Sequence, residues 1–108
     1  MAPPRLILTT RPRDDAARDI TLLEQRGARA ISAPMLEIRA LSPEWPDASG
    51  FDGVVLTSRH AAALIRDSGF LSLPCFCVGN TTSGEARKAG FTTVITGPGD
   101  GDGLTGMI

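Results

Sequence analysis

The sequence lacks several features that would mark a membrane, secreted or nucleic-acid-binding protein. Its 108 residues include no tyrosine, one histidine and two cysteines, and no apolar run approaches the length of a membrane span. The 11 basic and 12 acidic residues leave a net charge of −1, which gives no basic field for nucleic acid. The first residues do not have the anatomy of a signal peptide. We therefore expect a cytoplasmic protein that binds neither nucleic acid nor a membrane.

The two cysteines do not indicate a metal site or a disulfide framework. Cys75 and Cys77 are one residue apart, and in a strand they would point to the same face. Metal sites usually need the spacing C-x-x-C together with further ligands. We expect two reduced, buried thiols and no metal.

What the sequence does contain is an alternation of apolar, strand-like runs with helical patterns. The expected strands are residues 5–10, 29–33, 53–57, 74–78 and 92–95. The expected helices are residues 14–26, residues from Ser58 to about Asp67, a helix that Thr82 and Glu85 open as a capping box, and a last helix capped by Asp102. Such alternation predicts an α/β fold, with a parallel sheet flanked by helices in flavodoxin-like or Rossmann-like lobes.

A connector interrupts this alternation at residues 41–50, which carry Ser42, Pro43, Pro46 and Gly50. Trp45 lies between these prolines, and we expect it to pack the connector onto a lobe. The last predicted helix shows a start signal and no stop signal before the sequence ends. We therefore expect a truncated sequence and an incomplete last lobe.

Polar turns follow three of the predicted strands. They are Thr9-Thr10-Arg11, Thr57-Ser58-Arg59 and Gly79-Asn80-Thr81-Thr82. Each lies between a strand and a helix N-terminus, where free backbone N–H groups and the helix dipole favour anions. A ligand with several carboxylates would suit such turns. Helix capping is the ordinary alternative for these residue types, and it is clearest for Thr82.

Three further features are better explained by structure than by chemistry. His60 lies in the first turn of a predicted helix without a suitably spaced acid or nucleophile, which favours a solvent-facing or capping role. Asp14 and Asp15 could be the acidic pair of a receiver domain, but they open a helix. The alternating glycines of residues 97–103 lack the spacing of a nucleotide-binding loop.

Five ordered segments resemble the uroporphyrinogen-III synthase family. They are RLILTTRPR at residues 5–13, GARA at 27–30 followed by PMLEI at 34–38, FDGVVLTS at 51–58, CVGNTT at 77–82 and GPGDGDGL at 97–104. The chain departs from the family at Arg59 and His60, where small or amide residues are more usual. The family's chain is also considerably longer.

The resemblance implies two α/β lobes joined by a connector. Residues 1–36 would start lobe one, residues 37–50 would form the connector, and residues 51–108 would form an incomplete lobe two. It implies a lyase that cyclises hydroxymethylbilane to uroporphyrinogen III with inversion of ring D and loss of water, in haem biosynthesis, without a cofactor. The isolated sequence would be inactive, and its exposed apolar surface would favour self-association.

The substrate's acetate and propionate groups would meet the polar turns. The candidate substrate-binding residues are Thr10, Arg11, Thr57, Ser58, Gly79, Asn80, Thr81 and Thr82. Arg11 would pair with a carboxylate. The catalytic residues stay unknown, because the tyrosine implicated in the family has no counterpart here. The alternative is a non-catalytic module, either tetrapyrrole-binding or receiver-like.

Overall fold

Parallel strands and helices alternate along the chain in the computed structural model, which describes residues 3, 5–41, 44–66 and 68–108. The chain divides into two units, Met1–Ala40 and Leu41–Ile108. Each unit contains its own parallel sheet with at least one helix packed on it. The α/β class predicted from the sequence is therefore confirmed. No helix of the described residues has both the length and the apolar character needed to cross a membrane.

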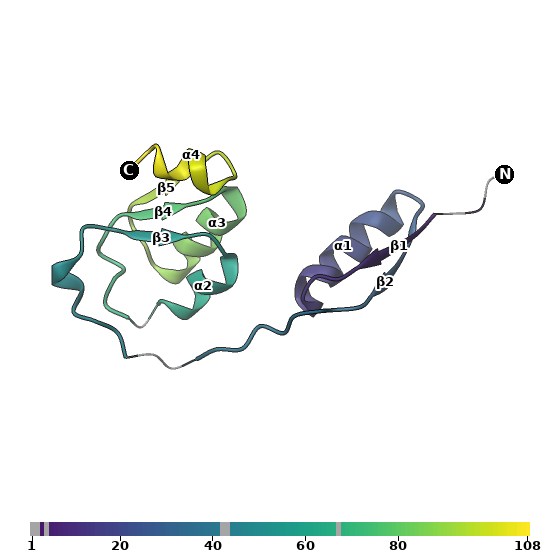
Figure 1. Ribbon diagram of the computed structural model, residues 1–108, viewed down its shortest axis with the longest axis horizontal. Helices are drawn as coiled ribbons and strands as arrows, with labels where there is room; N and C mark the ends of the chain where they lie inside the picture. The colour runs from purple at the N-terminus through teal and green to yellow at the C-terminus, as the bar shows by residue number, and fades with distance from the viewer. Residues whose placement is uncertain (1–2, 4, 42–43, 67) are drawn as a thin grey trace. The chain divides into compact units, whose positions relative to one another are not determined.

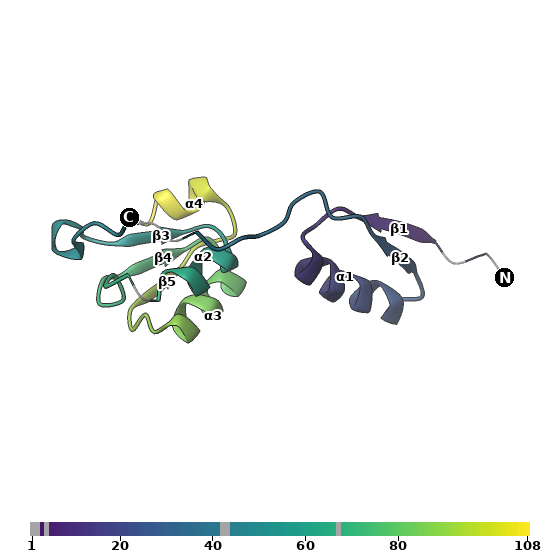
Figure 2. The same ribbon diagram turned by 90° about the horizontal axis from the view of Figure 1, so that it is seen from below.

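The first unit is one β-α-β motif. Strand β1 (Leu6–Thr9) and strand β2 (Arg29–Ser32) pair in parallel, and helix α1 (Arg13–Gln25) connects them. Figure 2 shows α1 on one face of the two strands, where Ala16 is fully buried. Side chains alternate along a strand, so Leu6, Leu8 and Ile31 share the opposite face and are 61%, 60% and 52% exposed. One face of this small sheet is therefore apolar and open to solvent.

The second unit contains a sheet in the order β3-β4-β5, with all strands parallel (Figure 1). In chain order, its elements are a 3₁₀ turn at Ala48–Gly50, β3 (Val54–Leu56), α2 (Arg59–Leu64), β4 (Cys75–Cys77), α3 (Asn80–Ala89), β5 (Val94–Thr96) and α4 (Gly101–Thr105). Helices α2 and α3 lie on one side of the sheet and α4 on the other (Figures 1 and 2). Gly90 ends α3 with φ +119°, a conformation that other residues rarely adopt.

The core of the second unit lies between the sheet and the helices α2 and α3. It is built from Leu56, Ala62, Ile65, Phe70, Cys75, Cys77, Ala86 and Phe91. Both cysteines are free and fully buried, as predicted, and their Sγ atoms are 3.6 Å apart. Burial, together with the neighbouring Cys77 thiol, raises the pKa of Cys75 to about 12. The pair fills space in the core and is poorly suited to nucleophilic chemistry.

The connector's tryptophan packs onto the second unit, as expected. The ring of Trp45 lies 6.0 Å from that of Phe70 between centroids, and the Phe51 ring lies 5.4 Å from the same Phe70 ring. Residues 42 and 43, two of those on which the connector prediction depended, lie outside the described residues.

Two helix caps differ from the sequence prediction. Helix α3 begins at Asn80 after Gly79, so Thr82 is inside the first turn and 5% exposed, and the predicted capping box is wrong. Helix α4 is capped by Asp100 rather than Asp102, because the Asp100 carboxylate accepts a 2.6 Å hydrogen bond from the N–H of Gly103. Helix α2 ends at Leu64, and the predicted end at Asp67 lies outside the described residues.

Candidate functional site

Three polar turns lie side by side at one edge of the second unit's sheet. The strands end in register, with Leu56 paired to Cys77 and Cys77 paired to Thr96. The strand ladder continues into the turns, where the N–H of Val78 donates to the Leu56 carbonyl at 3.1 Å and the N–H of Gly97 donates to the Cys77 carbonyl at 2.7 Å. The turns after β3, β4 and β5 therefore form one continuous polar edge. This is the edge at which ligands bind in parallel α/β sheets.

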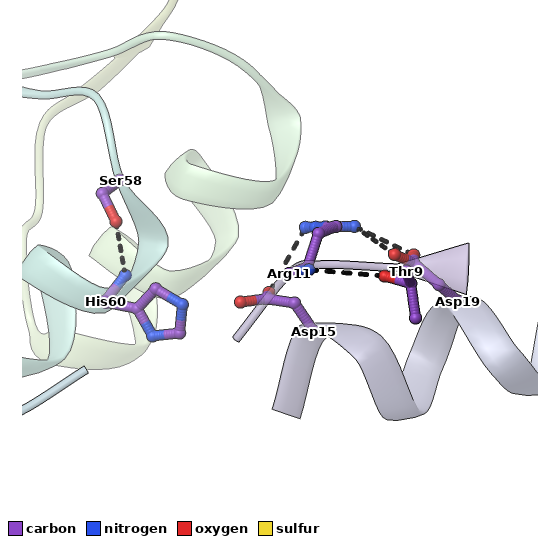
Figure 3. Close-up of polar contacts among 6 residues, drawn as sticks. All are labelled: Thr9, Arg11, Asp15, Asp19, Ser58 and His60. Carbon is purple, nitrogen blue, oxygen red and sulfur yellow. Dashed lines mark hydrogen bonds and ion pairs between the residues drawn. The ribbon is translucent and has the colours of Figure 1, made fainter. Parts of the chain in front are cut away.

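Most of the predicted site residues in this unit are accessible at that edge. Thr57, Ser58, Asn80 and Thr81 are exposed, and Gly79 is half-buried. Ser58 also caps α2, because its Oγ accepts a 3.2 Å hydrogen bond from the N–H of His60 (Figure 3). Capping thus explains part of the role of Ser58, while Thr57 is an exposed residue.

The start of α3 is the most suitable place for an anion at this edge. Its N-cap residue, Gly79, has no side chain and so makes no side-chain capping bond. The N–H of Ser83 is the first to bond back, donating to the Gly79 carbonyl at 3.0 Å. The N–H groups of Asn80, Thr81 and Thr82 precede it, so they are available to a ligand at the positive end of a ten-residue helix. Thr82 can contribute its backbone N–H even though its side chain is buried.

A glycine shapes the turn after β5. A Cβ atom at Gly97 would lie 3.0 Å from Leu104 Cδ1 and 3.1 Å from the carbonyl oxygens of Cys77 and Val78. The next N–H along this loop, from Gly99, donates to the Val78 carbonyl at 2.7 Å. Packing of this loop against the turn after β4 accounts for the glycine at residue 97. The sequence pattern alone did not show this role.

A part-buried pair of hydroxyl groups supports the same edge of the sheet. The Ser83 and Thr96 hydroxyl oxygens are 2.7 Å apart in a hydrogen bond, and Ser83 is fully buried. The bond ties the first turn of α3 to the end of β5. Sequence reasoning missed this pair, because the two residues are 13 positions apart and each resembles an ordinary turn residue.

The first unit presents its own polar turn between β1 and α1. Thr10 and Arg11 are both exposed, and the Thr10 carbonyl accepts a 3.0 Å hydrogen bond from the N–H of Met35. Figure 3 shows the Arg11 guanidinium between the carboxylates of Asp15 and Asp19. Both Asp19 oxygens are 2.9 Å from Arg11 Nη1, and Asp15 Oδ1 is 3.4 Å from Nη2.

These carboxylates were not among the predicted site residues. Their spacing of four residues, Arg11-x-x-x-Asp15-x-x-x-Asp19, is the signal that could have revealed them. Asp14 and Asp15 lie in the first turn of α1, as the helix interpretation predicted.

Comparison with protein families gives one match. Residues 17–108 match the model of the family described as uroporphyrinogen-III synthase HemD. This range covers more than half of the chain and includes all three polar turns of the second unit, while Thr10 and Arg11 precede it. No curated protein matches the chain significantly.

Proposed function

Because the chain belongs to the uroporphyrinogen-III synthase family, we propose that it acts in the cyclisation of hydroxymethylbilane to uroporphyrinogen III. The family is one of lyase-type enzymes with a small-molecule tetrapyrrole substrate. The proposed reaction inverts ring D and releases water, as one step of haem biosynthesis in the cytoplasm, without a metal or organic cofactor.

One observation supports this proposal most directly. The turns after β3, β4 and β5 form a single edge rich in hydroxyl groups and free N–H groups, and the N-terminus of α3 lies within it. The substrate carries acetate and propionate carboxylates, which bind well to hydroxyls and helix N-termini. Such an edge holds a polyanion without a cluster of lysine or arginine side chains, in keeping with the chain's net charge of −1.

We propose that the substrate contacts are made by the residues predicted from the sequence. The residues are Thr10, Arg11, Thr57, Ser58, Gly79, Asn80, Thr81 and Thr82. Arg11 would bind a carboxylate with its guanidinium, whereas Gly79, Asn80, Thr81 and Thr82 would offer the backbone N–H groups at the start of α3. In lobe terms, residues 1–36 would belong to lobe one, 37–50 to the connector and 51–108 to lobe two.

Positioning would supply much of the catalysis. The linear substrate must fold until its two ends meet. Holding the reacting ends together lowers the entropic part of the activation barrier. Loss of the substrate hydroxyl would give an azafulvene-like cation, and a spiro intermediate would then invert ring D. Carboxylate contacts that fix the substrate backbone would promote this path without a strong nucleophile.

We expect the 108 residues by themselves to be inactive. Arg11 and Thr10 are carried by a two-stranded sheet whose outer face is open, with Leu6 and Leu8 largely exposed. Small sheets of this kind hold their loops weakly, and loose positioning reduces the rate sharply. The same open face would favour association between copies of the chain.

The decisive experiment is an isomer assay. Hydroxymethylbilane is generated enzymatically and incubated with the protein encoded by the full reading frame that contains this sequence, and the products are oxidised and separated. We expect the type III isomer. Formation of only the spontaneous type I isomer would refute the proposal. Binding of the tetrapyrrole without ring closure would instead favour a non-catalytic binding module, and phosphorylation of Asp14 or Asp15 by acetyl phosphate would favour a receiver-like one.

A further inference from the structure

An ion-pair cluster in the first unit surrounds Arg11. Its guanidinium binds Asp19 through Nη1 and Asp15 through Nη2, with distances of 2.9 and 3.4 Å. We infer that Asp15 and Asp19 are positioning residues that hold the Arg11 guanidinium in the orientation that receives a substrate carboxylate. The inference rests on the proposed function, in which Arg11 is a substrate contact.

The two carboxylates approach Arg11 from one face of α1. Asp15 and Asp19 are four residues apart, about one helical turn, so their side chains project in nearly the same direction. Figure 3 shows them at opposite ends of the guanidinium. The Asp15 side chain is 6% exposed and that of Asp19 is 28% exposed. A buried anchor and a half-buried anchor therefore fix both ends of the planar group.

Asp15 and Asp19 together form a clamp on Arg11, and this clamp leaves part of the guanidinium available. An arginine has five N–H donors, and the contacts to Asp15 and Asp19 involve Nη1 and Nη2. Within the part of the chain that the structure describes, Nε takes no part in these contacts. The Arg11 side chain is 56% exposed, so the remaining donors can reach a ligand. A carboxylate could bind there without first displacing Asp19.

The benefit of the clamp is preorganisation. A free arginine side chain loses rotamer freedom when it binds a ligand, and this loss weakens binding. Arg11 loses part of that freedom within the protein itself, because Asp15 and Asp19 contact the two ends of its guanidinium. A ligand that meets a fixed guanidinium therefore binds more tightly than one that must order it.

Charge acts in the opposite direction. Two carboxylates beside one guanidinium leave the cluster with a formal charge of −1, which by itself repels another carboxylate. Water screens this repulsion, because the Arg11 side chain is more than half exposed. Preorganisation and charge therefore predict opposite changes in KM when the Asp19 charge is removed, so one variant can separate them.

The test uses the protein encoded by the full reading frame and measures KM and kcat for hydroxymethylbilane. We expect Asp19→Asn to raise KM about three- to tenfold with little change in kcat, as for the loss of one ordered side chain. Asp14→Asn is the matched control, because it removes the same charge from an exposed position on the same helix outside the Arg11 cluster. Its KM should equal that of the wild type.

A double variant shows whether Asp19 acts through Arg11. Arg11→Gln should raise KM, and adding Asp19→Asn to it should cause no further rise. If Arg11→Gln does not fold, Arg11→Lys replaces it, since lysine keeps the charge and loses the planar fork. The thermal midpoint of every variant is measured beside its kinetics.

Each outcome has a definite meaning. An unchanged or lowered KM for Asp19→Asn would overturn the inference, and so would a fall in thermal midpoint without a change in KM. An unchanged KM for Arg11→Gln in a protein that still makes the type III isomer would overturn the inference and leave the proposed function intact. If the wild type makes no type III isomer, the proposed function fails and the inference fails with it.

Discussion

The hydroxyl groups of Ser83 and Thr96 meet at 2.7 Å and join the first turn of α3 to the end of β5. The N–H of Ser83 also donates to the Gly79 carbonyl, so the bond is linked to the turn that begins with Gly79. Its loss should affect the stability of the second unit and, through the turn, substrate binding.

Replacing Ser83 with alanine should destabilise the second unit by about 1–3 kcal/mol, because the Thr96 hydroxyl loses its buried partner. The additional change Thr96→Val removes the orphaned hydroxyl, so the double variant should recover part of that loss. Urea unfolding followed by fluorescence gives both values. If the changes in free energy of unfolding caused by Ser83→Ala and Thr96→Val simply add in the double variant, the two hydroxyls do not interact.

Replacing Gly97 with alanine should destabilise the turn after β5 by about 1–3 kcal/mol, because the new methyl group would press on Leu104 and on two carbonyl oxygens. Gly84 is a matched control, since it lies inside α3 and a Cβ there would meet open space. Gly84→Ala should stabilise the helix by roughly 0.5–1 kcal/mol. Equal effects of the two changes on the unfolding midpoint would contradict the packing role of Gly97.

Replacing Asn80 with aspartate should raise KM about tenfold or more while leaving the fold at least as stable. The new carboxylate would favour the N-terminus of α3, but it would repel the substrate carboxylate expected there. Thr92→Asp adds the same charge at an exposed position before β5, at the other end of the strand, and serves as the control. If both variants raise KM equally, net charge rather than the α3 site is responsible.

The stability of the second unit should fall as the pH rises from about 8.5 to 12. A free thiol ionises near pH 8.5, whereas burial raises the pKa of Cys75 to about 12. The unfolded state therefore loses its proton first, and the stabilising contribution, complete below about pH 8.5, declines above it. The chain has no tyrosine and a single lysine, so few other groups ionise in this window.

Urea midpoints measured at pH 7, 9 and 10.5 would show this decline. The variant Cys75→Ala should have a flatter dependence on pH than the wild type. Iodoacetamide should also leave both thiols of the native protein unmodified at pH 8 and label them in urea, because the thiols are fully buried. Rapid labelling of the native protein would contradict the buried, protonated state.

The 108-residue chain should self-associate through the open face of the β1–β2 sheet. Leu8→Thr places a polar side chain on that face and should shift sedimentation toward the monomer. Leu22, 54% exposed on α1, provides the control, since Leu22→Gln removes a similar exposed leucine outside the sheet. A wild-type chain that remains monomeric at high concentration would refute this prediction.

Apolar runs and their periodicity were enough to predict the strands and the helices α1 and α2, whereas α3 and α4 were predicted from cap residues. The alternation of strands and helices predicted the parallel pairing. The edge carrying Thr57, Asn80 and Thr81 followed from this pattern, because the ends of neighbouring parallel strands lie together. The helix starts were less predictable. Thr82 and Glu85 match a capping box, but the same two residue types are also compatible with positions inside the helix. The extended backbone at Gly79 makes that residue the N-cap and places Thr82 in the first turn.

Other features depend on contacts between residues distant in the sequence. Asp100 and Asp102 are equally good N-cap residues by type. Asp100 caps the helix because its carboxylate accepts a hydrogen bond from the N–H of Gly103. The Ser83–Thr96 bond requires the register of β5 against α3. Interactions of this kind follow from three-dimensional packing, which a single sequence does not specify.

Trp45 and Phe70, whose rings are in contact, belong to a set of aromatic side chains that gives the two units different optical properties. The one tryptophan and the four phenylalanines all lie between residues 45 and 91, within the unit Leu41–Ile108. Tryptophan emission and near-ultraviolet dichroism therefore report on that unit alone, while α1 of the other unit contributes only to the far-ultraviolet signal. Heat-unfolding curves recorded by near-ultraviolet and by far-ultraviolet dichroism would separate the melting of the two units without any label.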